Sequence, residues 1–376
     1  MVGSLPPAKG ISPYMLHLVQ SLAGREDVDL EVVTFASIYP RWLYPGGDPE
    51  DGSAPSAVPG ARVRRLLSWY NPVAALWAGA SLRGDVVHAQ WWSYVLAPVY
   101  ALMLAVARLR GKKVVVTVHN AAPHESSRLS RLLNRAVYAF AHSFVVHAGQ
   151  NRDALRPAAR GRRIDVLPMG AIGTAVEPRS KSEARRTAGL DPRAKVVLAF
   201  GNIRPYKGLD VLIDAFAAVV RDIPEAVLVI AGKPWSDWQP YESLIASLGL
   251  SGRVRLFLDF IPNDLVEALF VASDVVVLPY KHFDAQSAVG AQALAFGRPM
   301  VVSDAGGLPE LVGRPEAVFP AGDAPALAAA LARVLSDGAL AQAMARDSER
   351  LARELSWDAI AERTVEVYRQ VLSGGA

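Results

Sequence analysis

One short segment of the chain places two basic residues between an apolar run and an amphipathic helical pattern. The run Val196–Phe200 ends at Gly201, and Arg204, Lys207 and Gly208 follow within seven residues. The next apolar residues recur at the spacing of one helical face: Leu209, Leu212, Ile213 and Phe216. Glycine lets a backbone approach a ligand closely, a helix N-terminus carries positive potential, and Arg and Lys neutralise phosphate charge. The segment predicts an anion site at a strand-to-helix turn, with an ordinary surface loop and two solvated bases as the alternative.

This segment contains the motif GNIRPYKG at 201–208, and four other short motifs occur elsewhere in the chain. They are TVHN at 117–120, VVVLPY at 275–280, AFGRP at 295–299 and GGLPE at 306–310. Over nearly its whole length the chain resembles retaining glycosyltransferases of the GT-B fold, family GT4. The resemblance implies transfer of a sugar from a nucleotide-diphosphate sugar to a glycan, lipid-linked or small-molecule acceptor. It also implies that no metal or other cofactor is bound.

The resemblance assigns four residues to the chemistry. Arg204 and Lys207 match the basic pair that holds the donor diphosphate. His119, at the end of an apolar run, matches a His beside the donor sugar and phosphate, and the alternative is a structural His at a strand end. The family has Glu, seven residues and a second Glu where this chain has Asp284 and Gln292. Asp keeps the charge that faces the transferred sugar, whereas Gln keeps hydrogen-bonding groups for the ribose without the charge.

The remaining residues of the predicted site would bind the substrate. They are Lys9, Gly10, Gly201, Ser287, Ala288, Val289 and Gln292. Ser287 to Val289 would open a helix whose free N–H groups meet the diphosphate. Lys9 stands where the family has the first of two glycines, which adds charge and restricts the backbone. No two His have metal-ligand spacing, so no metal site is predicted.

Composition and charge restrict the class of protein. The 376 residues are 51% hydrophobic and 20% charged and include no cysteine, so disulfides and thiolate sites are excluded. Residues 1–170 contain 19 basic and 11 acidic residues, a net +8, whereas the remainder has 21 and 25, a net −4. The basic half predicts an anionic contact. With the helical segment Arg128–Arg135, it suggests peripheral binding to an anionic membrane. We expect a cytoplasmic protein with no nucleic-acid partner.

Short apolar runs alternate with helical patterns through both halves, which predicts two α/β domains with parallel sheets. We expect Rossmann-like domains at 1–173 and 174–355 that face a cleft, the first for the acceptor and the second for the donor. The amphipathic helix 356–376 would cross back to the first domain, as the resemblance implies. Val86–Ala107 lacks charged residues but includes Pro98, which favours a buried strand and a core helix over a membrane span. The opening MVGSLPPAKGIS resembles the loop after a first strand. Either the true start lies upstream or the sheet tolerates a strand of two or three residues, and we expect the first, an incomplete N-terminus.

Two other functions share parts of this pattern. A sugar-nucleotide epimerase of the same fold would have the same anion site, and a non-catalytic sugar-nucleotide-binding scaffold would fit the loss of charge at Gln292. A nicotinamide dehydrogenase is disfavoured because no G-x-G-x-x-G motif follows a strand. For sugar transfer we expect a front-side mechanism, in which the leaving phosphate oxygen accepts the acceptor proton. Asp284 stays open as an enzymic nucleophile.

Overall fold

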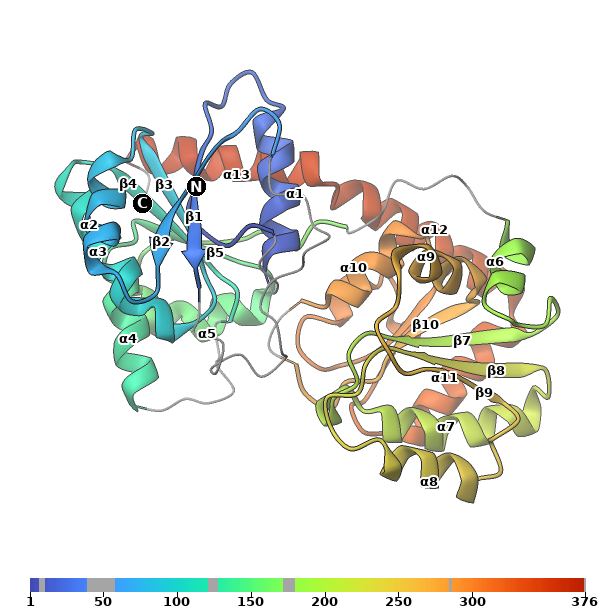
Figure 1. Ribbon diagram of the computed structural model, residues 1–376. Helices are drawn as coiled ribbons and strands as arrows, with labels where there is room; N and C mark the ends of the chain where they lie inside the picture. The colour runs from blue at the N-terminus through green and yellow to red at the C-terminus, as the bar shows by residue number, and fades with distance from the viewer. Residues whose placement is uncertain (7–10, 39–57, 121–127, 172–179, 284–285, 375–376) are drawn as a thin grey trace. The chain divides into compact units, whose positions relative to one another are not determined.

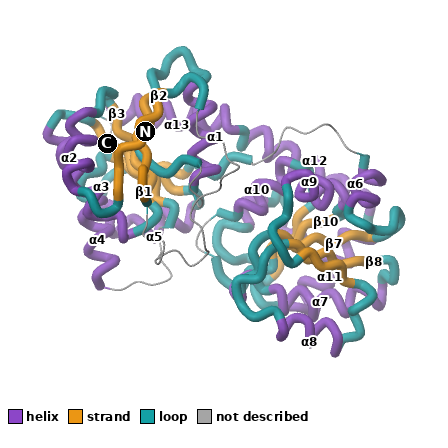
Figure 2. The backbone as a smooth tube through the Cα atoms, in the orientation of Figure 1, coloured by secondary structure: helices purple, strands orange, loops and turns teal. Residues whose placement is uncertain are grey.

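A computed structural model describes residues 1–6, 11–38, 58–120, 128–171, 180–283 and 286–374. The chain divides into two compact units. Unit 1 comprises Met1–Gly170 and Ser356–Ala376, and unit 2 comprises Ala171–Leu355. Each unit has parallel strands packed between helices, in two sheets in unit 1 and one sheet in unit 2, as Figures 1 and 2 show. The boundary expected at Gly173 lies outside the described residues.

Every strand pairing in unit 1 is parallel. The strands are β1 (Glu31–Ser37), β2 (Arg62–Ser68), β3 (Val86–Trp91), β4 (Lys113–Val118), β5 (Ser143–Val146) and β6 (Ile164–Val166). β1 pairs with β2, and the other four follow the order β3-β4-β5-β6. Val2 bridges Val33 of β1 and Ala89 of β3, so the first residues join the two sheets.

Helices cover both faces of the sheet in unit 1. They are α1 (Ser12–Ala23), α2 (Pro72–Ser81), α3 (Ala97–Leu109), α4 (Arg128–Tyr138), α5 (Gly149–Ala159) and α13 (Trp357–Leu372), with a 3-10 turn at Tyr94–Leu96. Alternate residues of a strand face opposite sides. Accordingly Val114 and Val116 of β4 enter the core that includes α3, whereas Val115 packs with Val367 and Val371 of α13.

The uncharged stretch Val86–Ala107 forms β3 and most of α3, with Tyr100, Met103 and Leu104 fully buried. No single helix in the described part of the chain is long and apolar enough to cross a membrane. Ala324–Ser336 and Gly338–Glu354, bent by 98° at their junction, meet that test only as a pair and only by length and composition.

Helix α13 belongs to unit 1 although unit 2 precedes it in the chain. The Trp357 ring occupies the space where a Cβ atom at Gly170 would lie, 2.5 Å away, so only glycine fits there. The same ring stacks on His17 at 5.3 Å between centroids. At the other end of the helix, Arg369 donates to Asp27 at 2.8 Å. These contacts fasten α13 along its length.

Unit 2 has one six-stranded parallel sheet in the order β12-β11-β10-β7-β8-β9. The strands are β7 (Lys195–Phe200), β8 (Ala226–Ala231), β9 (Val254–Phe257), β10 (Val275–Leu278), β11 (Met300–Ser303) and β12 (Val318–Phe319). The chain runs from β7 to β8 on one side and later places β10 on the other side of β7. Ligands of such sheets bind where the order reverses, beyond the carboxyl ends of the strands. The topology therefore directs attention to the ends of β7 and β10.

Two groups of helices flank this sheet (Figure 1). One group is α7 (Leu209–Asp222), α8 (Gln239–Ser247) and α11 (Ala324–Ser336). The other is α6 (Lys181–Thr187), α9 (Asn263–Ala272), α10 (Ala288–Ala295) and α12 (Gly338–Glu354). Short 3-10 turns occur at Pro205–Lys207, Pro309–Leu311 and Pro315–Ala317.

Candidate functional site

The turn after β7 is built on glycines. Gly201 has φ +93°, in the region that side chains disfavour, and its N–H donates to the Ala231 carbonyl at 2.8 Å. Gly232 directly follows the neighbouring strand β8, and a Cβ atom there would overlap the Gly201 carbonyl. Gly208 also has positive φ, and a Cβ atom there would overlap the Pro279 carbonyl. The backbones at the ends of β7, β8 and β10 therefore approach one another more closely than side chains would allow.

The two predicted cations lie in this turn. The Arg204 guanidinium is 3.9 Å from the centroid of the Trp235 ring, which orients it by a cation–π contact. The Lys207 ammonium lies 5.5 Å from the Tyr280 ring centroid. That ammonium is also 3.1 Å from the point where a Cβ atom at Gly201 would lie. The side chain of Lys207 thus folds back over the end of β7.

No carboxylate of the described residues neutralises the charge on these two side chains. Lys281 at the same edge pairs with Asp210 at 2.6 Å, whereas neither Arg204 nor Lys207 forms an ion pair among the described residues. Burial, with the Arg204 charge as a second cause, lowers the pKa of Lys207 to about 8. A half-buried ammonium without a counter-ion is costly in the apo protein. An incoming anion would remove that cost, so the pair is suited to binding phosphate.

The first turn of α10 lies at the same place. Ser287 caps the helix by accepting the Gly290 N–H at 3.3 Å, and its hydroxyl is 3.2 Å from the Tyr280 hydroxyl. A methyl of Val289 lies 3.0 Å from the point that a Cβ atom at Gly201 would occupy. The N–H groups of a helix's first turn have no partner within the helix. Gly201, Lys207 and the start of α10 are therefore brought together, as the sequence predicts.

A small pocket adjoins this arrangement. It is lined by Ala199, Phe200, Gly201, Ile203, Lys207, Leu209, Ile230, Val277, Pro279 and Tyr280. Gln292 is half-buried one turn along α10 from Ala288, which is exposed. Asp284, Lys9 and Gly10 lie outside the described residues, so their predicted contacts stay predictions.

His119 follows β4 in unit 1 and is only 7% exposed. Its Nε2 is 2.8 Å from the Gln90 side-chain oxygen, and its Nδ1 is 3.1 Å from Nε2 of His147. The Tyr14 ring packs edge-on against it at 5.0 Å. Both ring nitrogens therefore have partners within unit 1, and the predicted contact of His119 with the donor stays a prediction.

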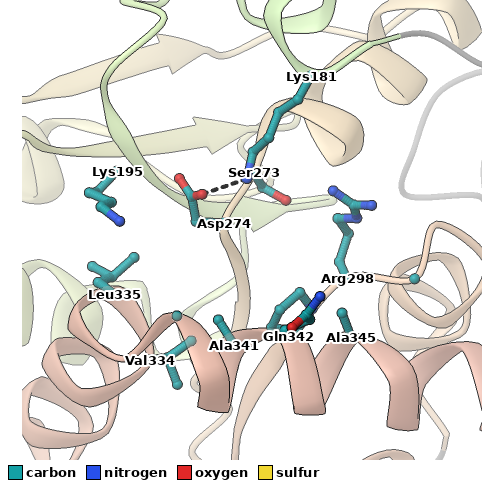
Figure 3. Close-up of a pocket in the computed structure, with 13 residues that line it drawn as sticks. Lys181, Lys195, Ser273, Asp274, Arg298, Val334, Leu335, Ala341, Gln342 and Ala345 are labelled. Carbon is teal, nitrogen blue, oxygen red and sulfur yellow. Dashed lines mark hydrogen bonds and ion pairs between the residues drawn. The ribbon is translucent and has the colours of Figure 1, made fainter.

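A second pocket of about 270 Å³ lies at the amino ends of the unit 2 strands (Figure 3). Asp274, just before β10, accepts from Lys181 at 2.5 Å, Arg185 at 2.8 Å and the Val196 N–H at 2.6 Å. Lys195 and Arg298 also line it. These contacts fasten β7, β10 and α6 to one another. Because ligands of parallel sheets bind at the opposite edge, the site remains assigned to the turn after β7.

Sequence reasoning missed residues that shape the site. They are Trp235, which stacks on Arg204, and Gly232, which makes room for Gly201. Gly232 had a readable signal, because it directly follows a buried apolar run in the same way as Gly201. Trp235 has no such signal in the sequence, because Arg204 follows β7 whereas Trp235 follows β8, and only the fold brings them together.

Comparison with known proteins places both units in one enzyme family. Residues 180–351 match the family described as glycosyl transferases group 1, and residues 9–170 match the glycosyl transferase 4-like domain. The D-inositol 3-phosphate glycosyltransferase of Rhodococcus jostii is 28% identical over 396 aligned residues, covering 96% of this chain and 84% of that protein. Its counterpart in Segniliparus rotundus is 33% identical over 224 residues, covering 58% of this chain and 49% of that protein.

Solved structures agree at the level of the fold. Sucrose-phosphate synthase from Thermosynechococcus elongatus has a TM-score of 0.72 at 22% identity, covering 99% of this chain and 96% of that one. Anabaena HepE, solved with UDP-glucose, has a TM-score of 0.73 at 19% identity, with 98% of each chain covered. With both family matches in sequence order and the parallel sheets of each unit in place, the chain belongs to the group 1 glycosyltransferases of the GT4 type and has the GT-B fold.

Proposed function

We propose that this glycosyltransferase uses a nucleotide-diphosphate sugar and transfers the sugar with retention, without a metal ion. The observation that carries the proposal is the Lys207 ammonium, which lies beside Gly201 and the first turn of α10 with no ion pair among the described residues. Arg204, held by Trp235, adds a second cation. Together they supply the positive charge that a departing diphosphate requires, which a metal ion supplies in other enzymes.

The proposed step is a front-side displacement. The bond between the sugar C1 and the diphosphate oxygen breaks, and Arg204 and Lys207 stabilise the charge that develops on that oxygen. The same oxygen takes the proton of the acceptor hydroxyl, whose oxygen then bonds C1 from the face that the leaving group occupied. Retention of configuration follows from that geometry.

The relatives narrow the compounds to test first. HepE was solved with UDP and with UDP-glucose, so UDP is the first base to examine. The curated relatives are named for D-inositol 3-phosphate, so a polyol phosphate is the first small-molecule acceptor. Glycans and lipid-linked sugars are the other acceptor classes.

The test is a ligand series followed by product analysis. UDP, GDP and ADP are compared by thermal denaturation, since a ligand at about 100 times its Kd stabilises the native state by about 2.7 kcal/mol. The sugar derivatives of the stabilising base are then incubated with each acceptor class, with and without EDTA. We expect a glycoside with the donor's anomeric configuration in both conditions. An inverted product, EDTA-sensitive transfer, or epimerised free donor without transfer would contradict the proposal.

A further inference from the structure

Three buried histidines and a glutamine form a continuous hydrogen-bonded row across unit 1. His147 Nδ1 is 2.9 Å from the Leu167 carbonyl, and His147 Nε2 is 3.1 Å from His119 Nδ1. The Gln90 amide is 2.8 Å from His119 Nε2 and 3.3 Å from His88 Nε2. Two further contacts complete the row at 2.6 Å each, from His88 Nε2 to the Thr117 hydroxyl and from His88 Nδ1 to the Tyr368 hydroxyl. The row runs from the end of β6 to α13.

The Leu167 carbonyl determines the proton position at one end. A carbonyl can only accept, so His147 must carry its proton on Nδ1. If His147 is neutral, its Nε2 is an acceptor. His119 must then donate to it and carry its own proton on Nδ1.

The surroundings keep these rings neutral. His88, His119 and His147 are 2%, 7% and 2% exposed, and no carboxylate is among the partners of any of them in the described part of the chain. Burial lowers the pKa of His147 to about 4 and of His88 to about 3, and it places the pKa of His119 well below the ordinary value. An imidazolium in this row would be a buried charge without a counter-ion.

Neutral His119 has a lone pair on Nε2, which needs a donor. The nearer amide atom of Gln90 is the oxygen, and two acceptors facing each other repel. A half-turn of the amide exchanges oxygen and nitrogen with almost no change of shape. The Gln90 N–H group then donates to His119, its oxygen faces His88 Nε2–H, and the Tyr368 hydroxyl donates to His88 Nδ1. In this arrangement each ring nitrogen of the three histidines faces a complementary donor or acceptor.

We infer that His147 and Gln90 are positioning residues that hold His119 as a neutral imidazole with its proton on Nδ1 and a lone pair on Nε2. The inference rests on the proposed function only where it relates His119 to sugar transfer, since the family resemblance puts this residue beside the donor sugar. In this form both ring nitrogens of His119 are engaged within unit 1, Nδ1 with His147 and Nε2 with Gln90, and the imidazole is fixed in orientation. It does not donate to the diphosphate, which is left to Arg204 and Lys207.

Nitrogen-15 NMR of histidine-labelled full-length protein tests the tautomers directly and requires no substrate. At pH 7 we expect His119 and His147 to carry one proton each on Nδ1, and His88 to carry one on Nε2. Signals are assigned by replacing each histidine in turn. A doubly protonated ring in the row, or a proton on Nε2 of His119, would overturn the inference whatever reaction the enzyme catalyses.

A matched pair of variants links the tautomer to the reaction. In His147→Gln the amide oxygen can still accept from His119 Nδ1, so we expect the Nδ1–H signal and kcat within about threefold of the parent. His147→Phe removes the acceptor, so His119 shifts its proton to Nε2 and kcat falls by about tenfold or more. Melting curves separate this effect from instability. Equal loss of kcat in both variants with an unchanged His119 signal would contradict the positioning role. Correct tautomers without sugar transfer in any form would instead contradict the proposed function.

Discussion

The ammonium group of Lys207 lies against Gly201, where a Cβ atom would come within 3.1 Å of its nitrogen. The absence of a side chain at Gly201 thus leaves room for this ammonium at the end of β7. Its φ of +93° provides a second reason for glycine. The two effects can be separated, because other glycines of unit 2 have positive φ without such neighbours.

Gly201→Ala should weaken nucleotide binding as well as stability. The strained backbone costs about 1–2 kcal/mol, and the added methyl displaces Lys207 and Val289. Gly249→Ala is the matched control, with φ +69° and nothing within 4 Å of the added atom. We expect similar losses in melting temperature and at least a tenfold weaker nucleotide affinity in Gly201→Ala alone. Unchanged nucleotide binding in Gly201→Ala would remove this turn from the site.

Nucleotide affinity should fall as pH rises through about 8. Burial lowers the pKa of Lys207 to about that value, so the ammonium that would hold the diphosphate loses its proton there. The free energy of unfolding of the apo protein should show the opposite trend. The unfolded chain keeps this proton up to its ordinary pKa, so the contribution of Lys207 to stability rises between pH 8 and that value. Isothermal titration with UDP across this range measures the first effect. Lys207→Met should lack the inflection, and an identical inflection in that variant would assign it to another group.

Gln292→Glu should keep or improve nucleotide affinity. The expectation follows from the resemblance, in which this position carries a Glu that contacts the ribose, and Gln292 is half-buried in α10. A carboxylate at an unrelated half-buried position would be destabilising instead. Nucleotide titration beside a melting curve distinguishes these cases. A lower melting temperature without any change in nucleotide affinity would show that the helix is wrongly aligned with the family.

We propose that α4 of unit 1 binds anionic membrane surfaces reversibly. Arg128, Arg131 and Arg135 are exposed on it, together with Leu129 and Leu132, which are 61% and 64% exposed. Each basic residue near such a surface contributes about 1 kcal/mol, which decays within a Debye length.

Co-sedimentation with vesicles tests the α4 surface. Replacing its three arginines by glutamine should abolish binding to phosphatidylserine vesicles at low salt, and neutral vesicles should bind neither form. The control replaces Arg346, Arg350 and Arg353 of α12, which are exposed in unit 2. The proposal would be contradicted if the control variant lost as much vesicle binding as the α4 variant, or if the parent protein did not bind the vesicles.

Local patterns in the sequence predicted most of the elements. Eleven of the twelve described strands coincide with segments that the sequence pattern predicts as strands. β10, for example, is buried on both faces and is a continuous apolar run. Helix α2 was missed although Asn71 caps it by accepting the Ala74 N–H at 3.1 Å and Pro72 begins it. Its apolar residues Val73 and Trp77 are exposed, so the usual amphipathic pattern is absent. The two-residue β12 is too short to leave any pattern.

The site was predictable where its residues follow one another, and less so where distant strands meet. Gly201, Arg204 and Lys207 lie on one turn, so their proximity follows from spacing. The row of His88, His119 and His147 joins three strands, and the sequence separates these residues by about 30 positions each. The contacts of these three residues with one another and with Gln90 therefore have no local signal in the sequence.

The central claim is that Arg204 and Lys207 stabilise the leaving diphosphate, and turnover of the two alanine variants tests it most directly. With the donor identified, each of Arg204→Ala and Lys207→Ala should lower kcat by about a hundredfold or more, because charge on the leaving group is then less stabilised. Lys195→Ala, at the opposite end of the same strand, should stay within about twofold of the parent. Rates near that of the parent in both Arg204→Ala and Lys207→Ala, with folded protein, would contradict the account.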